Sequence, residues 1–298
     1  MSESSANRPL FLDGQAGMAS VSIGKEDVAV IVPTHDSVAT LRCCLESIRA
    51  QTQPCTLIVV DNGSMDGTHL IAEELADLVI DCGPERSAQR NAGARATVAR
   101  FVGFIDSDME LSPGVVGEAV AELRTGAASV VVPEQTVGEG FWTMVRAYER
   151  SLYLGSEAIE APRFFQREVF NSVGGFDETM TGPEDWDLSI RTRQKGPRVR
   201  IESVILHHEG RVRYFSACRK KGYYGPGLVR FSAKHGATGV FVASQRPWLR
   251  RPRALMNPLG IGLLALKVGE ASAVLLVVAR RQFSKQPVTA RRIRKWNS

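Results

Sequence analysis

A short apolar segment ends in two carboxylates, and this is where the sequence is best suited to hold a cation. Residues 101–105 (FVGFI) have the composition of a buried strand, and Asp106 and Asp108 follow them. Two carboxylates separated by one residue can turn toward the same ion. Their hard oxygen atoms suit Mg²⁺ or Mn²⁺, which in turn bridges phosphate groups. An ordinary polar turn is the alternative for this pattern taken alone.

A second acidic group, Glu184 and Asp185, follows a glycine-rich segment at residues 174–177 (GGFD). A carboxylate beside a metal-bound diphosphate could remove the proton from an acceptor hydroxyl as a general base. The alternative is the acidic first turn of a helix, where the helix dipole stabilises negative charge. The preceding glycines and the indole of Trp186 favour a structured loop over a solvated one.

Two further features could complete a site. The turn at residues 61–67 (DNGSMDG) could hydrogen-bond a base or a ribose, although a plain Asx or glycine turn has the same composition. His207 and His208 end a predicted strand, and one of them could be a metal ligand or a structural residue. The motifs G-x-G-x-x-G and G-x-x-x-x-G-K-[ST] are both missing, so dinucleotide oxidoreductases and P-loop proteins lose their main support.

These groups would be positioned by alternating strands and helices. Apolar runs predict the strands, and a 3.6-residue apolar period predicts the helices. Strands are expected at residues 28–32, 56–60, 78–80, 101–105, 128–132 and 199–206, and helices at residues 38–51, 68–75, 87–99, 113–123 and 141–154. This order predicts an α/β fold with a mostly parallel sheet flanked by helices. Ligands bind such sheets beyond the carboxyl ends of the strands, where Asp61, Asp106 and Asp108 fall.

Charge divides the 298-residue chain into two parts. Residues 1–190 contain 13 Lys and Arg against 29 Asp and Glu, a net charge of −16, whereas residues 191–298 contain 24 against 3, a net charge of +21. The acidic part gathers the candidate carboxylates, and the basic part indicates an anionic surface or ligand. Five cysteines without a C-x-x-C pair disfavour zinc and a disulfide framework, and they fit a reducing cytosol.

The basic part contains an apolar segment, residues 259–279, between clusters of arginine. Its length would reach across a bilayer, but Lys267 and Glu270 lie inside it, and mid-membrane charges cost about 2.5–3.5 kcal/mol each. A helix lying in the membrane interface is the favoured interpretation, and a helix packed on protein is the alternative. No nucleic-acid-binding motif accompanies the basic residues, so we expect an anionic membrane surface and no nucleic acid as partner.

The expected organisation has three parts. Residues 1–27 lack the basic and apolar regions of a signal peptide, and we expect them to form a mobile tail. Residues 28–215 would form the α/β domain, and residues 216–298 a basic, aromatic region with a helical apolar segment. We expect the protein in the cytoplasm, attached peripherally to the cytoplasmic face of the cell membrane.

Five segments, in order along residues 28–224, resemble family 2 glycosyltransferases with the GT-A fold. They are VIVPTHDSVATLRCCLESIRAQT, VVDNGSMDGT, RSAQRNAGARAT, FIDSD and GGFDETMTGPEDWDLSIR. The resemblance implies a nucleotide-diphosphate-sugar donor, a divalent cation (Mg²⁺ or Mn²⁺) and inversion at the anomeric carbon. Together with the expected membrane attachment, it points to a lipid-linked or cell-envelope glycan as the acceptor.

The resemblance also assigns roles to individual residues. Those that it places at the donor are Pro33, Thr34, Asp61, Asn62, Arg90 and Asp106. Asp108 would be the main cation ligand, with Asp106 facing the ribose or the metal. Asp185 would be the general base, and Glu184 would place the acceptor. His208, or as second choice His207, would contact the metal or the diphosphate.

Two other functions remain open from the sequence. A non-catalytic protein of the same fold could act as a membrane-associated assembly partner, although it would not need both acidic pairs. A sugar nucleotidyltransferase is the weaker alternative, because the glycine-rich, basic loop that such enzymes have after the first strand is missing at residues 33–40. Release of a nucleoside diphosphate would indicate sugar transfer, and release of pyrophosphate would indicate nucleotidyl transfer.

Overall fold

The computed structural model describes residues 10–13, 26–246, 249 and 251–283. The chain divides into two compact units. The first unit contains residues 1–134, 161–178 and 187–208, and the second contains residues 135–160, 179–186 and 209–298. This division differs from the predicted boundary after residue 215, because two internal segments group with the C-terminal part.

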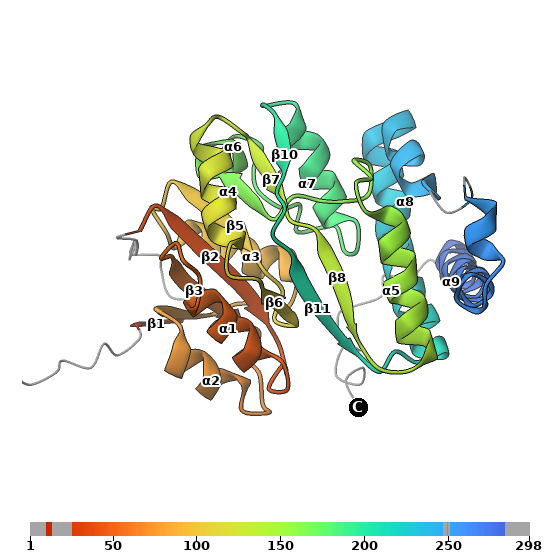
Figure 1. Ribbon diagram of the computed structural model, residues 1–298, viewed down its shortest axis with the longest axis horizontal. Coiled ribbons are helices and arrows are strands. Elements are labelled where there is room, and N and C mark those ends of the chain that lie inside the picture. Colours follow the sequence, from red (N-terminus) through yellow and green to blue (C-terminus); the bar gives the residue numbers. More distant parts are fainter. Residues whose placement is uncertain (1–9, 14–25, 247–248, 250, 284–298) are drawn as a thin grey trace, which may run out of the picture. The chain divides into compact units, whose positions relative to one another are not determined.

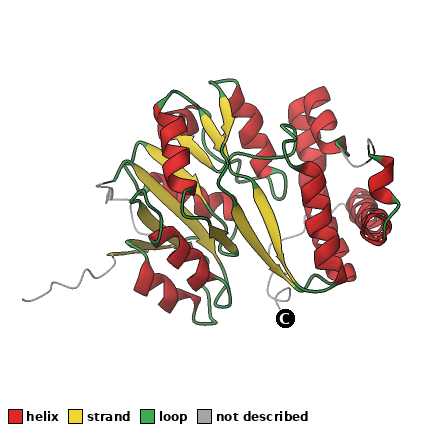
Figure 2. Ribbon diagram, viewed as in Figure 1, coloured by secondary structure: helices red, strands yellow, loops and turns green. Residues whose placement is uncertain are grey.

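An eight-stranded sheet forms the centre of the first unit (Figures 1 and 2). Its order is β1 (Leu10–Asp13), β4 (Leu78–Asp81), β3 (Thr56–Asp61), β2 (Val28–Thr34), β5 (Phe101–Phe104), β9 (Phe164–Gln166), β7 (Ser129–Val131) and β10 (Arg198–Arg200). Neighbouring strands are parallel, except that β9 is antiparallel to both β5 and β7. The predicted α/β fold with a mostly parallel sheet is therefore confirmed.

Helices pack on both faces of this sheet. They are α1 (Leu41–Arg49), α2 (Thr68–Leu75), α3 (Arg86–Arg95), α4 (Val115–Arg124), α6 (Arg167–Ser172) and the greater part of α7 (Glu184–Arg193). Val30 and Val32 of β2 join the core that contains α1, α2 and α4, whereas Ile31 joins the core that contains α3 and α6. Because both faces are buried, the central strands are continuous apolar runs in the sequence.

A three-stranded sheet has the order β6 (Met109–Leu111), β11 (Ile205–Gly210) and β8 (Glu134–Gly138). Strand β11 is antiparallel to β6, and His207 is paired in register with Met109. The sequence predicts one strand at residues 199–206, but the structure has β10 and β11 there. The irregular residues 201–204 separate them, since the two strands belong to different sheets.

The predicted N-terminal tail is partly ordered. Residues 10–13 form β1, which pairs in parallel with β4 at the edge of the large sheet. An edge strand offers a row of unpaired backbone groups, and the short apolar segment Leu10-Phe11-Leu12 is of a type that can pair with them. The other residues of the predicted tail, 1–9 and 14–25, lie outside the described residues.

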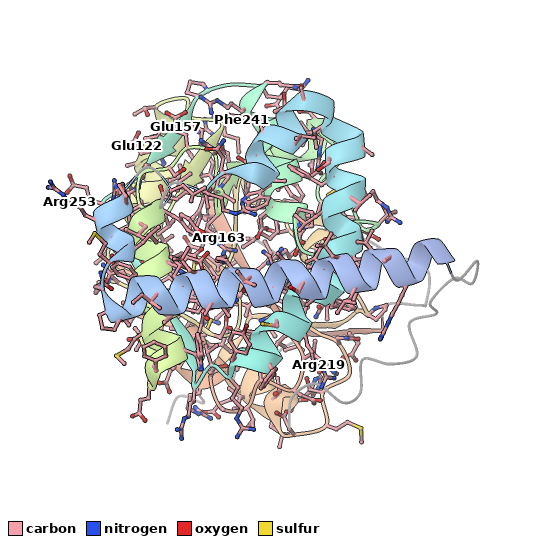
Figure 3. The ribbon with its side chains drawn as sticks, turned by 90° about the vertical axis from the view of Figure 1, so that its right-hand side faces the viewer. Glu122, Glu157, Arg163, Arg219, Phe241 and Arg253 are labelled. Carbon is pink, nitrogen blue, oxygen red and sulfur yellow. The ribbon has the colours of Figure 1, made fainter. Side chains whose placement is uncertain are left out.

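The second unit is largely helical. It contains α5 (Phe141–Tyr153), α8 (Tyr214–Ser244), the short helix η2 (Pro252–Leu255) and α9 (Pro258–Phe283). Val145, Leu263 and Leu266 lie in its apolar core, and α9 runs across α8 and α5 and packs on both (Figure 3). Helix α8 is interrupted at Gly236, whose φ of 53° is in the left-handed region that glycine tolerates. Helix α9 confirms that the predicted apolar segment at residues 259–279 is helical.

Candidate active site

The loops that follow β2 and β3 hold each other through hydrogen bonds. The backbone N–H groups of residues 36–38 donate to the second loop, and Met65 N donates back to Asp36 Oδ1 at 2.9 Å. The acceptors of the first three bonds are Ser64 Oγ at 2.9 Å, Thr68 Oγ1 at 2.7 Å and Asp66 Oδ2 at 3.1 Å. These reciprocal bonds satisfy polar backbone groups and preorganise both loops.

Four of the residues that the resemblance places at the donor lie together at the ends of these strands. They are Pro33, Thr34, Asp61 and Asn62. Pro33 and Thr34 are paired in register with Val60 and Asp61. Asn62 N donates a hydrogen bond to Thr34 O at 3.0 Å. Carboxyl ends of adjacent parallel strands are where α/β sheets bind ligands, so these residues occupy the expected edge of the sheet.

Two buried polar groups, Asp61 and Thr34, mark this edge. Asp61 is 1% exposed, and its carboxylate accepts from Ser64 Oγ at 2.5 Å and Ser64 N at 3.1 Å, with His69 Nδ1 at 3.4 Å. Thr34 is 3% exposed, and its hydroxyl has no hydrogen-bond partner within the described part of the chain. A buried hydroxyl without a partner costs free energy, which a ligand can recover by supplying the bond.

Helix α3 supports the site through two buried amide side chains. Gln89 Nε2 donates to Thr34 O at 2.9 Å and to Val60 O at 2.7 Å, so it joins the ends of β2 and β3. Asn91 exchanges hydrogen bonds with both backbone groups of Phe176, each at 2.9 Å. The helix therefore fixes the two strand ends and also the loop that contains residues 174–177.

Asp106 is clasped by two arginines. Arg90 Nη2 donates to Asp106 Oδ1 at 2.6 Å, and Arg163 Nη1 donates to Asp106 Oδ2 at 3.4 Å. Arg163 also donates to Glu134 Oε1, at 3.0 Å from Nε and 2.6 Å from Nη2. Burial alone would raise the pKa of Asp106, but the nearby arginines outweigh it and hold this pKa far below its usual range.

These contacts change the roles expected for Asp106 and Arg90. Both Asp106 oxygens face guanidinium groups, so the carboxylate is poorly placed to ligate a cation as predicted. Arg90 is 1% exposed, and its guanidinium lies over the ring of Phe176, 5.0 Å from the centroid. Arg90 therefore supports Asp106, and the place near the donor that the resemblance gives it stays a prediction.

The two histidines of β11 have different partners. His207 Nε2 lies 3.2 Å from Asp108 Oδ2, and His207 Nδ1 lies 3.5 Å from Glu134 Oε2. His208 Nε2 lies 2.8 Å from Glu110 Oε2. Successive side chains of a strand point to opposite faces, so only one of the two can face Asp108. The histidine beside Asp108 is His207, whereas the resemblance favours His208 over His207 as the contact to the metal or the diphosphate.

The predicted acidic pair forms the start of α7. Glu184 is 3% exposed, and its carboxylate accepts a hydrogen bond from Gly182 N, whereas Asp185 is partly exposed. Trp186 Nε1 donates to Ile159 O at 3.0 Å, so the indole anchors this turn. Both carboxylates belong to the second unit, while the residues at the strand ends belong to the first.

Sequence reasoning does not identify three residues of the site. Arg163 directly precedes β9 and Glu134 begins β8, and only the fold brings them to Asp106 and His207. Arg86 is exposed on the first turn of α3 and lowers the pKa of Asp106 together with Arg90 and Arg163. Its spacing of four residues from Arg90 places both on one face of the helix, which is the signal that could have identified it.

Comparison with known proteins identifies the family of the chain. Residues 29–179 match the model of the family described as Glycosyl transferase family 2. A pre-mycofactocin glycosyltransferase from Mycobacterium tuberculosis is 29% identical over 235 residues, which cover 70% of this chain and 48% of that protein. The chain thus spans about half of that relative's length. The succinoglycan biosynthesis protein ExoA from Rhizobium meliloti is 26% identical over 248 residues, which cover 74% of each chain.

Solved structures share the fold at low sequence identity. The mannosyltransferase PcManGT from Pyrobaculum calidifontis, in complex with GDP-Man and Mn²⁺, has a TM-score of 0.59 and 18% identity, and the match covers 88% of each chain. TarS 1–349 from S. aureus, in complex with UDP-GlcNAc, has a TM-score of 0.51 and 17% identity, over 86% of this chain and 92% of that one.

Proposed function

Because the chain belongs to glycosyl transferase family 2, we propose that it transfers a sugar from a nucleotide-diphosphate donor to an acceptor hydroxyl. The observation that carries this proposal is the preorganised edge formed by the ends of β2, β3 and β5. It holds buried Asp61, the unpartnered hydroxyl of Thr34 and the Asp106–Asp108 segment in one unit. Ser107 Oγ donates to Ser37 Oγ at 3.0 Å, which ties that segment to the loop after β2.

The residues around Asp108 fit a divalent cation. Asp108 is 40% exposed and so accessible, and the imidazole of His207 and the carboxylate of Glu134 lie on its side of β11. A set of oxygen ligands with one imidazole suits Mn²⁺. The same set suits Mg²⁺ if water molecules fill more of the ligand positions. Such a cation, when bound, would neutralise charge on the leaving nucleoside diphosphate. We place Asp108 and His207 as its ligands, and Asp106 as a group that orients Arg90 and Arg163.

Substitution of His207 tests this metal assignment. His207→Ala should weaken Mn²⁺-dependent binding of a nucleoside diphosphate by at least about 10-fold, since even outer-shell partners of a metal are worth 10–100-fold. His235→Ala is the matched control, because His235 lies on α8 in the second unit, where it packs on Phe231. Isothermal titration of both variants with and without Mn²⁺ measures the difference. Equal loss in the two variants would contradict the assignment.

Arg86 and Asp185 complete the proposed mechanism. We place Arg86 at the donor phosphates, because it is an exposed cation in the first turn of α3 and acts on Asp106, whereas Arg90 is buried. Asp185, the more exposed member of its pair, takes the proton of the acceptor hydroxyl as the new bond forms. The hydroxyl attacks the anomeric carbon from the side opposite the diphosphate, so the configuration inverts in one displacement. Buried Glu184 fixes the turn that places the acceptor.

A product assay separates this function from the alternatives. We expect sugar transfer to release a free nucleoside diphosphate and no pyrophosphate. A thermal-shift screen of nucleotide sugars with Mn²⁺ identifies the donor, because a ligand that binds only the folded protein raises its melting temperature. Release of pyrophosphate, or no turnover with any donor that binds, would overturn the proposal. The name of a relative in succinoglycan biosynthesis supports a glycan as the acceptor.

We also propose that the second unit attaches to an anionic membrane through α9. The helix is long and apolar enough to cross a membrane by length and composition alone. Its exposed side chains include Ile261, Leu264, Val268, Leu275 and Leu276. These residues recur at helical spacing, so they form one apolar face opposite the face that packs on α5 and α8.

The two charged residues inside α9 favour a helix that lies in the membrane interface over a helix that spans the membrane. Lys267 Nζ lies 2.8 Å from Glu270 and 2.5 Å from Glu149 of α5, and Glu270 also pairs with Arg146 of α5. The charges are thus neutralised inside the unit, on the face away from Val268. Exposed Arg253 precedes the helix, and basic residues near an anionic surface contribute about 1 kcal/mol each.

Flotation with anionic liposomes tests this attachment. Val268→Glu and Leu275→Glu should each reduce binding by about 10-fold or more, because burying such a side chain contributes about 1.5–3 kcal/mol. Leu70→Glu in the first unit is the matched control, since Leu70 is 68% exposed and Val268 is 67% exposed. Absence of binding by the unmodified protein at low salt, or equal binding of all three variants, would contradict the proposal.

A further inference from the structure

A second group of metal-binding side chains lies apart from Asp108. Cys43 on α1, Glu110 on β6 and His208 on β11 each offer a ligand atom, and these three atoms lie within 4.8 Å of one another. His208 Nε2 is 2.8 Å from Glu110 Oε2. Burial and a hydrogen bond to Glu110 raise the pKa of the Cys43 thiol. The three side chains thus already converge on one point.

Regular secondary structure holds these three residues in place. Cys43 precedes Cys44 and Leu45, both of which are buried in the core beneath α1. Glu110 is paired in register with Leu206 of β11, and His208 N donates to Asp108 O at 2.8 Å. Groups on packed helices and strands keep their separations better than groups on loops, so the ligand atoms are preorganised.

The chemistry of the group differs from that of the site at Asp108. A sulfur, an imidazole nitrogen and a carboxylate oxygen are the ligands that Zn²⁺ prefers, at metal distances of about 2.0–2.3 Å. Tetrahedral ligands at such distances are about 3.3–3.8 Å apart, so each side chain here needs to move by only about 1 Å. Cys43 is exposed, which leaves an entry path and room for a water molecule as fourth ligand.

We propose that Cys43, Glu110 and His208 form a second cation site, of the zinc type, with one position open to water. The absence of a C-x-x-C pair disfavours zinc in the sequence, but here the ligands come from three separate elements. A cation bound there would join α1, β6 and β11. It would also stiffen the segment around Asp108 and His207, since Glu110 and His208 are close to them in the chain.

Titration of the metal-free full-length protein with Co²⁺ tests the site, because Co²⁺ replaces Zn²⁺ and absorbs strongly in the near ultraviolet only when a thiolate ligates it. We expect a thiolate-to-cobalt band that saturates at one equivalent and disappears on addition of Zn²⁺. Cys43→Ser should abolish the band, and His208→Ala should weaken Co²⁺ binding by at least about 10-fold. Cys82→Ser is the matched control, since it removes another partly exposed cysteine and should leave the band unchanged.

A further variant separates this site from the proposed transferase site. Asp108→Asn should keep the thiolate-to-cobalt band while losing Mn²⁺-dependent nucleotide binding. Circular dichroism establishes whether each variant is folded. If Cys43→Ser does not fold, Glu110→Gln provides a second test of the site. No band in the unmodified protein, or a band that persists in Cys43→Ser, would overturn the second site without affecting the proposed function.

Discussion

Replacing Asp185 with asparagine should reduce the turnover number for sugar transfer by about 10²- to 10⁴-fold, the range that a general base typically contributes. Asparagine has nearly the same shape, but its amide cannot accept the proton of the acceptor hydroxyl. The residues proposed to bind the nucleoside and the metal belong to the first unit, so binding of the donor should remain unchanged. Release of nucleoside diphosphate measures turnover, and calorimetric titration with the donor and Mn²⁺ measures binding.

A helix-terminal carboxylate elsewhere provides the matched control for this prediction. Glu168 lies in the first turn of α6 and is exposed, as Asp185 lies in the first turn of α7. If Asp185 served only the helix dipole, Asp185→Asn and Glu168→Gln would each cost about 0.3–1 kcal/mol of stability and leave turnover unaltered. Turnover of Asp185→Asn within a few-fold of the unmodified protein would therefore contradict a role as general base.

The donor side of the site could be predicted because its signals are local. Thr34, Asp61 and Asp106 each follow an apolar run, and the ends of adjacent parallel strands meet at one edge of the sheet. The structure confirms the mostly parallel sheet that this argument requires. The succession of strands and helices over residues 28–105 therefore follows from the hydrophobic pattern, whereas the order of the strands within the sheet does not.

The partners across strands could not be predicted, because they depend on register between distant segments. His207 and Asp108 are 99 residues apart, and a shift of one residue in β11 would bring His208 to Asp108 instead. Arg163, just before β9, and Glu134, at the start of β8, reach Asp106 and His207 in the same way, from segments that the motifs do not include. Sequence spacing thus selects the candidate residues, and register selects which of them meet.

The partners of the charged residues inside α9 could not be predicted from the sequence either. Lys267 and Glu270 count against a membrane-spanning helix in the sequence, but their partners Arg146 and Glu149 lie on α5, more than 110 residues earlier. Only the packing of α5 on α9 shows that the charges face inward and the apolar side chains outward. The same pairing explains why α5 belongs to the second unit and not to the predicted α/β domain.

Replacing Arg90 with leucine should destabilise the first unit by about 3 kcal/mol, the lower end of the range for breaking a buried ion pair. The reason is that Asp106 would lose its 2.6 Å partner, while Arg163, at 3.4 Å, and the charge of Arg86 remain. Hydrogen exchange of peptides from β2 and β5 measures this locally. Arg42→Leu is the control, because Arg42 forms its ion pair with Glu74 at the exposed surface and should change exchange little.

The pH dependence of the stability lost in Arg90→Leu identifies the unpaired Asp106 carboxylate as the cause of that loss. The pKa of Asp106 is lowered in the folded protein, so its ion pairs stabilise the fold above the unfolded pKa of about 4. That contribution disappears as the pH falls, because the unfolded chain then binds a proton that the folded chain does not. The difference in unfolding free energy between the unmodified protein and Arg90→Leu should therefore be largest at neutral pH and should decrease below about pH 4.

A double substitution completes the argument for the Arg90–Asp106 pair. Leucine at both positions removes the buried charges together, and a buried pair replaced by apolar residues of similar volume is often neutral in stability. Arg90→Leu with Asp106→Leu should thus be more stable than Arg90→Leu alone, although it should not bind the donor. If the double variant were the less stable one, Asp106 would stabilise the fold through Arg163 even without Arg90, and an unpaired carboxylate would not be the cause of the loss.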